Sequence, residues 1–221
     1  MVERRRGGNE QERDETARLI VQAARRLFMA HGYRAVSTRQ VAEAVGLTQP
    51  ALYHHFATKE ELYVAVALGE VARLRGGIER LARREGAVRE RLHGIARFML
   101  TTVDYDFPQM YHDMGAELGE KSRATLGAAF FGGVIAPLAA LFAEGQAAGK
   151  LRDEAQGALS PAGAAGLFMA FVAHFLDRPL VGERATIPGG VNASATLLID
   201  LLFNGLTVKP GADPSAAGAR G

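Results

Sequence analysis

The sequence predicts an all-α fold, and three observations support this prediction. Apolar residues recur at intervals of three and four residues along most of the chain. No segment shows the strict alternation of a half-buried strand. Ser37, Thr48 and Thr58 each precede a helical pattern that they can cap. We predict a flexible N-terminal arm at 1–13, a three-helix domain at 14–58, a larger helical domain at 59–206 and a disordered tail at 207–221.

The first predicted helix has one apolar face and ends at His31-Gly32-Tyr33, where glycine lets the chain leave the helix. That face consists of Ala17, Ile20, Ala23, Ala24, Leu27 and Phe28. The preceding arm contains Arg4-Arg5-Arg6-Gly7-Gly8. We expect it to be flexible, because a charged, glycine-containing chain end offers little apolar surface to bury.

Two short helices joined at Gly46 follow. Ser37 lies three residues before Gln40, and Thr58 lies three residues before Glu61. This is the spacing of a capping box, which satisfies the free backbone N–H groups at the start of a helix. Gly46 provides the permissive backbone that a tight exit from the first short helix requires. Helices are therefore predicted to begin near residues 38 and 59.

The second short helix is predicted to run from its cap, Thr48, to about Phe56. Pro50 is tolerated in a first turn, where its missing N–H would have no partner within the helix. Leu52 and Phe56 are four residues apart and face the interior. The remaining side chains face solvent or a partner, and they are Gln49, Pro50, Ala51, Tyr53 and His54.

An exposed face of this composition suits the major groove of DNA. Glutamine can bond to adenine edges, alanine and proline can pack on thymine methyl groups, and hydroxyls and ring nitrogens can bond to phosphates. An ordinary amphipathic hairpin is the alternative for a helix-glycine-helix pattern on its own. The predicted DNA-contacting residues are Thr38, Arg39, Thr48, Gln49, Pro50, Ala51, Tyr53, His54 and Lys59.

From Thr16 to about Ala65 the chain resembles the DNA-binding domain of the TetR family of bacterial transcriptional regulators, of the AcrR type. The residues that carry this resemblance are Thr38, Ala42, Gly46, Leu47, Leu52-Tyr53, His55-Phe56 and Lys59. Pro50 departs from the pattern, because family members often carry a small flexible residue there. The resemblance implies an N-terminal helix-turn-helix DNA-binding domain followed by a C-terminal helical ligand-binding and dimerisation domain.

Charge is distributed unevenly along the chain. Residues 1–100 contain 18 Lys or Arg against 12 Asp or Glu, and residues 101–221 contain 8 against 12, which gives +6 and −4. A basic N-terminal half attracts a polyanion through counterion release. The chain has no cysteine, which excludes disulfides and thiolate metal sites. We identified neither a signal peptide nor an apolar run approaching the roughly 20 residues of a membrane span, so a cytoplasmic location without a membrane partner is predicted.

Beyond Lys59 the pattern predicts helices at 60–75, 78–104, 107–118, 121–149, 161–176 and 191–206. Gly76-Gly77 is expected to bend or end the first of these, and Pro137 to kink or break the fourth. The last two helices carry more apolar surface than a small bundle easily hides. We therefore expect a homodimer through the C-terminal helices, with an intramolecular core as the alternative. Two paired DNA-binding domains would match two half-sites.

The family resemblance implies a pocket among the central helices for an unknown small-molecule effector, which we expect to be apolar or amphipathic. The alternative for each candidate is an ordinary core position. The candidates are Phe98, Met99, Tyr105, Met110, Tyr111, Met114, Phe131, Phe168 and His174. His112-Asp113 lacks a second ligand pair at metal-site spacing, so we interpret it as a surface pair and expect no metal and no cofactor.

These features predict a sequence-specific DNA-binding transcriptional regulator, and our hypothesis is a repressor that a ligand releases from its double-stranded operator. A ligand-independent architectural or partner-binding protein associated with DNA is the alternative. An enzyme is not expected, because Gly132-Gly133 and Gly189-Gly190 lack the context of a phosphate-binding loop and no nucleophile with its base is recognisable.

Overall fold

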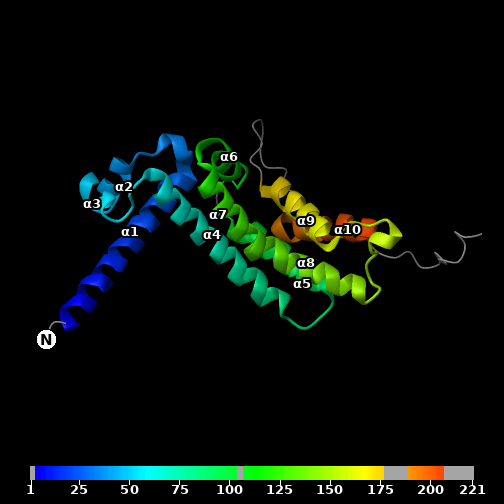
Figure 1. The fold of residues 1–221 in the computed structure, drawn as a ribbon. Helices are drawn as coiled ribbons and strands as arrows, with labels where there is room; N and C mark the ends of the chain where they lie inside the picture. The colour runs from blue at the N-terminus through cyan, green and yellow to red at the C-terminus, as the bar shows by residue number, and fades with distance from the viewer. Residues whose placement is uncertain (1–2, 104–106, 177–188, 207–221) are drawn as a thin grey trace, which may run out of the picture. The chain divides into compact units, whose positions relative to one another are not determined.

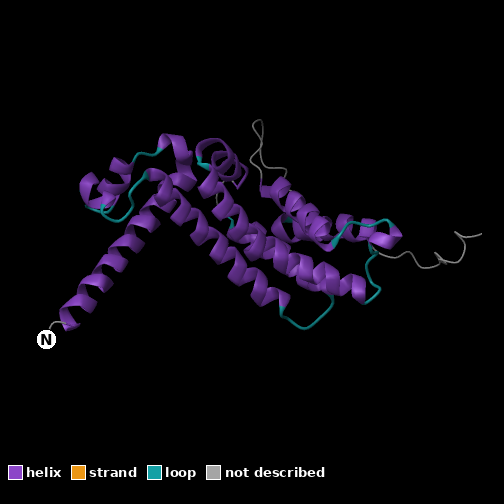
Figure 2. Ribbon diagram, in the orientation of Figure 1, coloured by secondary structure: helices purple, strands orange, loops and turns teal. Residues whose placement is uncertain are grey.

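The computed structural model describes residues 3–103, 107–176 and 189–206, and within these ranges it consists of helices and loops without a strand (Figure 2). The residues group into two compact units. The first unit contains the chain up to Arg75 together with Val103–Gly133. The second unit contains Gly76–Thr102, Val134–Phe175 and the described residues from 189 onward.

The first unit is built on α1 (Glu3–Ala35), α2 (Thr38–Ala44), α3 (Gln49–Tyr53), the first part of α4 (Lys59–Ala82), α6 (Phe107–Glu117) and α7 (Glu120–Phe130). In Figure 1, α2 and α3 lie beside α1, and α1 packs against both α2 and α6. The predicted apolar face of α1 is largely buried: Ile20, Ala23, Ala24 and Phe28 are at most 3% exposed. They form the core under α3 and α4 with Leu52, Leu62 and Tyr63.

The start of α1 differs from the prediction, and its end agrees with it. It already begins at Glu3, so most of the segment predicted as a flexible arm at 1–13 is helical. Glutamate, glutamine and arginine dominate this segment and favour helix formation, so the packed part of α1 can extend toward the N-terminus despite Gly7-Gly8. At the other end Gly32 leaves the helical conformation with φ 78°, as His31-Gly32-Tyr33 predicted.

The second unit contains the end of α4, α5 (Val88–Thr102), α8 (Ala136–Ala147), α9 (Pro161–Leu176) and α10 (Gly190–Leu206), with a 3-10 turn at Glu154–Gln156. The helix α5 packs against both α8 and α10. Its buried side is made of Leu92, Ile95, Ala96 and Met99. The facing core residues on α8 and α10 include Leu138, Phe142, Leu198 and Leu202.

The predicted division between residues 58 and 59 does not coincide with these units, because α4 passes from the first unit into the second at Arg75 and Gly76. The N-terminal helices share their core with the start of α4, and α6 packs on α1. The expected break at Gly76-Gly77 is also absent, since α4 is helical as far as Ala82. The break expected at Pro137 is present as a π-helical turn over Phe131–Ile135, immediately before α8.

The expectation that no apolar run reaches membrane-spanning length was wrong for Glu120–Ala147. This 28-residue helical stretch has a mean hydropathy of 2.0 in its most apolar window, long and apolar enough to cross a membrane. Residues 124–143 carry no charged side chain, although small residues dilute the apolar pattern. Leu126, Val134, Leu138 and Phe142 are buried within the fold, and 33% of the most apolar window is buried in all.

Candidate nucleic-acid interface

Local sequence signals fix the start of each helix in this interface. The Ser37 hydroxyl accepts a hydrogen bond from the Gln40 backbone N–H, and the Gln40 side chain accepts one from the Ser37 N–H at 2.7 Å. This is the predicted capping box. The Thr48 hydroxyl accepts from the Ala51 N–H at 3.3 Å at the start of α3. At the start of α4 the Thr58 hydroxyl accepts from the Glu61 N–H at 3.0 Å.

The turn between α2 and α3 places α3 on the surface of the first unit. Gly46 has φ 70°, a left-handed conformation that favours glycine, and the Leu47 N–H donates back to the Ala42 carbonyl at 2.9 Å. Leu52 is fully buried and Phe56 is 8% exposed, as their spacing predicted. The side chains of Gln49, Pro50, Tyr53 and His54 are exposed, and Ala51 is half-buried. The helix therefore presents one polar and aromatic face.

Thr38 lies beneath this face and differs from the other predicted DNA-contacting residues. It is only 5% exposed, which leaves little of it available to a partner. Its hydroxyl accepts a hydrogen bond from the Gln49 side-chain amide at 2.9 Å and lies 3.1 Å from the Tyr53 hydroxyl. Thr38 on α2 therefore holds two exposed side chains of α3 in place. Sequence spacing did not reveal this role, because the three residues meet only in the folded domain.

Lys59 is also engaged within the protein. Its ammonium group lies 4.1 Å from the centre of the Tyr33 ring, in a cation–π contact. Burial lowers the pKa of Lys59, while the carboxylates of Glu117 and Asp113 oppose this shift. Lys59 is half-buried, and its contact with Tyr33 joins the start of α4 to the end of α1. Its expected phosphate contact would have to compete with this position.

Two exposed arginines border the interface. Arg39 pairs with Glu43 one helical turn later at 2.8 Å, and the hydrogen bond to Glu43 raises the pKa of Arg39. Arg13 donates a hydrogen bond to the backbone carbonyl of His54, just after α3, at 3.3 Å. Arg13 was not among the predicted DNA-contacting residues, because the segment 1–13 was expected to be a flexible arm. Its signal was the spacing of Arg13, Ala17 and Ile20 along a continuous helix.

A second set of contacts joins α6 and α7 to the same part of the first unit. Asp113 is 5% exposed, and its carboxylate accepts a hydrogen bond from the Tyr33 N–H at 2.8 Å. The interpretation of His112-Asp113 as a surface pair was therefore wrong for Asp113. Glu117 pairs with Arg34 at 2.6 Å, and the Glu60 carboxylate accepts from the Gly119 N–H at 2.9 Å.

The predicted ligand-contacting residues that the structure describes differ in burial. Phe98 lines a groove of about 740 Å³ beside α5. Met99 and Phe168 are core residues, at 1% and 0% exposed. Phe131 and His174 are exposed and Met114 is half-buried. Tyr105 lies outside the described residues, and the side chains of Met110 and Tyr111 are likewise outside the description.

The late helices expose apolar side chains. Leu167 on α9 is 38% exposed, and Leu197 and Leu201 on α10 are 39% and 51% exposed. Leu197 and Leu201 are four residues apart, so they lie on one face of α10. Single exposed leucines are ordinary, but several of them on two apolar helices are typical of an association surface.

Comparison with known proteins identifies the helix-turn-helix unit. Residues 20–66 match the sequence model of the bacterial regulatory proteins of the tetR family. This part of the chain is a TetR-family domain. It is 33% identical over 101 residues to the transcriptional activator FasR of Mycolicibacterium smegmatis, a match covering 46% of each chain. It is 42% identical over 55 residues to the repressor AcnR of Corynebacterium efficiens, 25% of this chain and 29% of AcnR. The matches span less than half the length of these curated TetR regulators.

Solved structures resemble this fold over most of the chain. A transcriptional regulator from Saccharomonospora viridis, solved with choline, has a TM-score of 0.72 at 20% identity and covers 89% of this chain and 100% of its own. AibR, solved with isovaleryl coenzyme A and operator DNA, has a TM-score of 0.65 at 21% identity and covers 85% of this chain and 97% of its own. At such identities the likeness concerns the fold. It agrees with the expected all-α architecture.

Proposed function

We propose that this protein is a transcriptional regulator that binds a specific double-stranded DNA operator through α3. The observation that carries the proposal is the exposed face of α3, where Thr38 orders Gln49 and Tyr53 from below. A glutamine amide in a fixed position can bond to a base edge, and a tyrosine hydroxyl can reach a phosphate. Thr48, Pro50, Ala51 and His54 complete the contact surface, and Arg39 supplies positive charge beside it.

Homodimerisation is part of this proposal. A domain with one short recognition helix buries little surface on DNA, and a two-fold pair doubles the contact at two half-sites. We assign the dimer contact to the exposed leucines of the two late helices, Leu167 on α9 and Leu197 and Leu201 on α10. The resulting four-helix contact would cover apolar surface that is exposed in a single chain.

We further propose that a small molecule bound in the second unit changes DNA affinity, and that its binding releases repression. A ligand that favours one spacing of the two DNA-binding domains shifts the population toward that spacing. The helix α4 runs from the first unit into the second, so it is the segment to which we assign this coupling. The complexes of AibR and of the Saccharomonospora regulator with small molecules support an effector. Action in the cytoplasm follows from this proposal.

The test is a salt-dependent binding titration of the full chain with the promoter fragment beside its own gene. The variants are Gln49→Ala in α3 and Gln22→Ala, which removes an equally exposed amide on α1. We expect tight binding to the fragment, weak binding to scrambled DNA, and a roughly fivefold or larger loss for Gln49→Ala alone. Equal affinity for both DNAs, unaffected by either variant, would refute the assignment of α3. It would favour the architectural alternative.

A further inference from the structure

A groove in the second unit has a strongly positive lining that the proposed function does not use. It lies between the end of α4, one face of α5 and the start of α10, with a volume of about 740 Å³. Arg80 and Arg84 line it from α4 and the turn after it, and Arg97 lines it from α5. Glu90 is its carboxylate, so three arginines against one glutamate give a formal charge of +2.

These three arginines differ from their neighbours in having no carboxylate partner. Arg83 pairs with Glu79 at 3.7 Å, and Arg91 pairs with Glu144. Within the described ranges no ion pair involves Arg80, Arg84 or Arg97, and Arg97 instead donates to the neutral Asn192 side chain at 3.3 Å. Three guanidinium groups that line one groove with a single carboxylate leave a net positive charge, and a bound anion would offset this charge.

The floor of the groove is apolar. Leu81 is 9% exposed, and the half-buried Phe98 ring lies against the backbone of α4 at Gly77. Gly94, half-buried on α5, leaves space above this floor, since a Cβ built there has Leu81 as its nearest neighbour at 3.8 Å. A ligand that fits must therefore combine a negative group with a short apolar part.

We propose that this groove binds an amphipathic anion. Its phosphate or carboxylate group is held by Arg80, Arg84 and Arg97, and its apolar part rests on Leu81 and Phe98. The ligand expected from the sequence was apolar or amphipathic, and this site adds a selection for negative charge. As the site of the effector this inference rests on the proposed function, but binding to the groove does not require DNA.

The test is isothermal titration calorimetry of the full chain, without DNA, using hexyl phosphate and hexanoate. Hexan-1-ol and hexylammonium are the neutral and cationic counterparts. We expect one or both anions to bind, and neither counterpart. Binding of hexyl phosphate alone assigns the site to phosphate, whereas binding of both anions assigns it to either group. Absence of heat from both anions at millimolar concentration would overturn the proposal, as would equal binding of hexan-1-ol.

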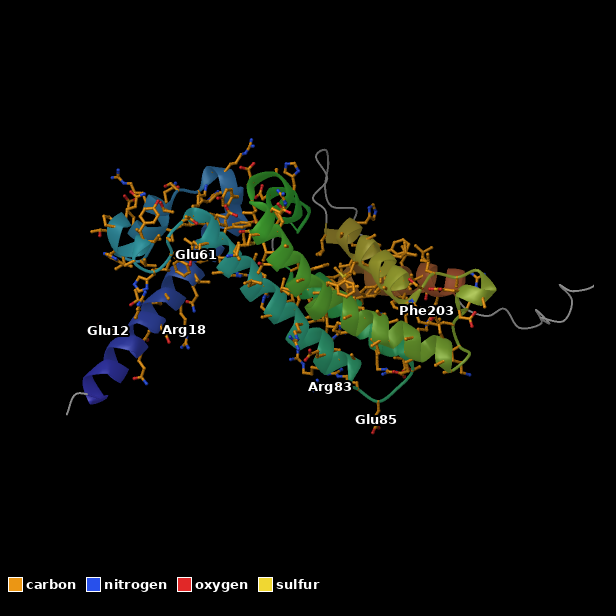
Figure 3. The ribbon with its side chains drawn as sticks, in the orientation of Figure 1. Glu12, Arg18, Glu61, Arg83, Glu85 and Phe203 are labelled. Carbon is orange, nitrogen blue, oxygen red and sulfur yellow. The ribbon has the colours of Figure 1, made fainter. Side chains whose placement is uncertain are left out.

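Charge and shape variants locate the binding. Arg84→Gln and Arg97→Gln should each weaken anion binding about tenfold. Arg83→Gln removes the same charge next to Arg84 but outside the groove lining (Figure 3 labels Arg83), so it should leave affinity unchanged. Gly94→Leu should fill the groove and abolish binding, while Gly94→Ala should retain it. Equal losses for Arg83→Gln and Arg84→Gln would overturn the proposal.

The two proposals can fail separately. If the protein binds the anion but does not bind the operator, the proposed regulator function would be refuted and the groove assignment would stand. If the protein binds the operator normally but does not bind either anion, the groove assignment alone would be refuted. Thermal unfolding of each variant establishes that it is folded before titration.

Discussion

Gly76 and Gly77 are adjacent in α4 but should respond in opposite directions to the same substitution. A Cβ built at Gly76 meets nothing within 4 Å, whereas one built at Gly77 lies 2.0, 2.2 and 2.7 Å from three carbons of the Phe98 ring. Real Cβ atoms do not approach so closely, so the ring or the helix must move. Gly77 therefore leaves room for the Phe98 ring of α5 against the backbone of α4.

The expected magnitudes follow from these distances. Alanine stabilises a helix interior by about 0.5–1 kcal/mol relative to glycine, so Gly76→Ala should be stabilising by that amount. Gly77→Ala gains the same propensity but overpacks its contact with Phe98, which typically costs about 1–3 kcal/mol. The two variants should differ by about 2 kcal/mol. For a chain of this size that corresponds to roughly 4–8 °C in Tm.

The assay is thermal unfolding followed by circular dichroism, at one protein concentration because a dimer would make Tm concentration-dependent. The double variant Gly77→Ala/Phe98→Leu removes the outer ring atoms and should recover part of the loss. Equal Tm values for Gly76→Ala and Gly77→Ala would refute the packing argument. So would a Gly77→Ala defect that Phe98→Leu does not reduce.

Three further predictions concern ion pairs and the association surface. Glu70 is 3% exposed and pairs with Arg25 at 2.5 Å and with Arg73. In urea titrations Glu70→Gln should lower the free energy of unfolding by about 2 kcal/mol. Glu43→Gln, which removes a carboxylate from an exposed pair, should change it by less than about 0.5 kcal/mol. Leu201→Glu should yield monomers in sedimentation velocity. Leu19→Glu is the control, because Leu19 is 53% exposed on α1, and this variant should remain a dimer. If both variants were dimers, the assigned surface would be contradicted. Hydrogen bonds from Ser122 and Gly119 lower the pKa of Glu60, so near pH 4 the unfolded chain binds more protons than the folded chain. Glu60 therefore contributes stability above its unfolded pKa, and this contribution is lost as the pH falls. Glu60→Gln should make the free energy of unfolding less dependent on pH between about pH 3 and 6, and an unchanged pH profile would contradict this.

The predictable part of this structure depends on signals that act within a few residues. The caps at Ser37, Thr48 and Thr58 and the left-handed Gly46 were predicted because each involves partners at most five residues away. The inward direction of Leu52 followed from helical spacing alone. Such features need no knowledge of the tertiary fold.

The features that sequence reasoning missed depend on residues far apart in the chain. Asp113 reaches the Tyr33 N–H across 80 positions, so its neighbour His112 gave no indication that it is buried. The contact at Gly77 depends on Phe98, 21 positions later, and so Gly76-Gly77 was interpreted as a bend or end of the helix. The basic groove combines arginines of α4 and the turn after it with Arg97 of α5, and spacing within one helix does not show that these residues share a groove.

The placement of the motif residues also narrows how DNA sequence could be read. Thr38 and Lys59 are engaged within the domain, and Gln49 and Tyr53 each share the Thr38 hydroxyl. The exposed Pro50 and the half-buried Ala51 offer no side-chain hydrogen bonds, so their contacts with bases would be apolar.

Thymine methyl groups are the apolar features of the major groove, which makes uracil substitution a direct test of this reading. Once the operator is mapped, replacing one contacted thymine by uracil removes a methyl group without changing base pairing. Affinity should fall about fourfold, because burial of one methyl group is worth about 0.8 kcal/mol. Uracil outside the half-sites is the control. If every uracil within the half-sites left affinity unchanged, Pro50 and Ala51 would not contact thymine, and discrimination would have to come from Gln49 or from the shape of the DNA.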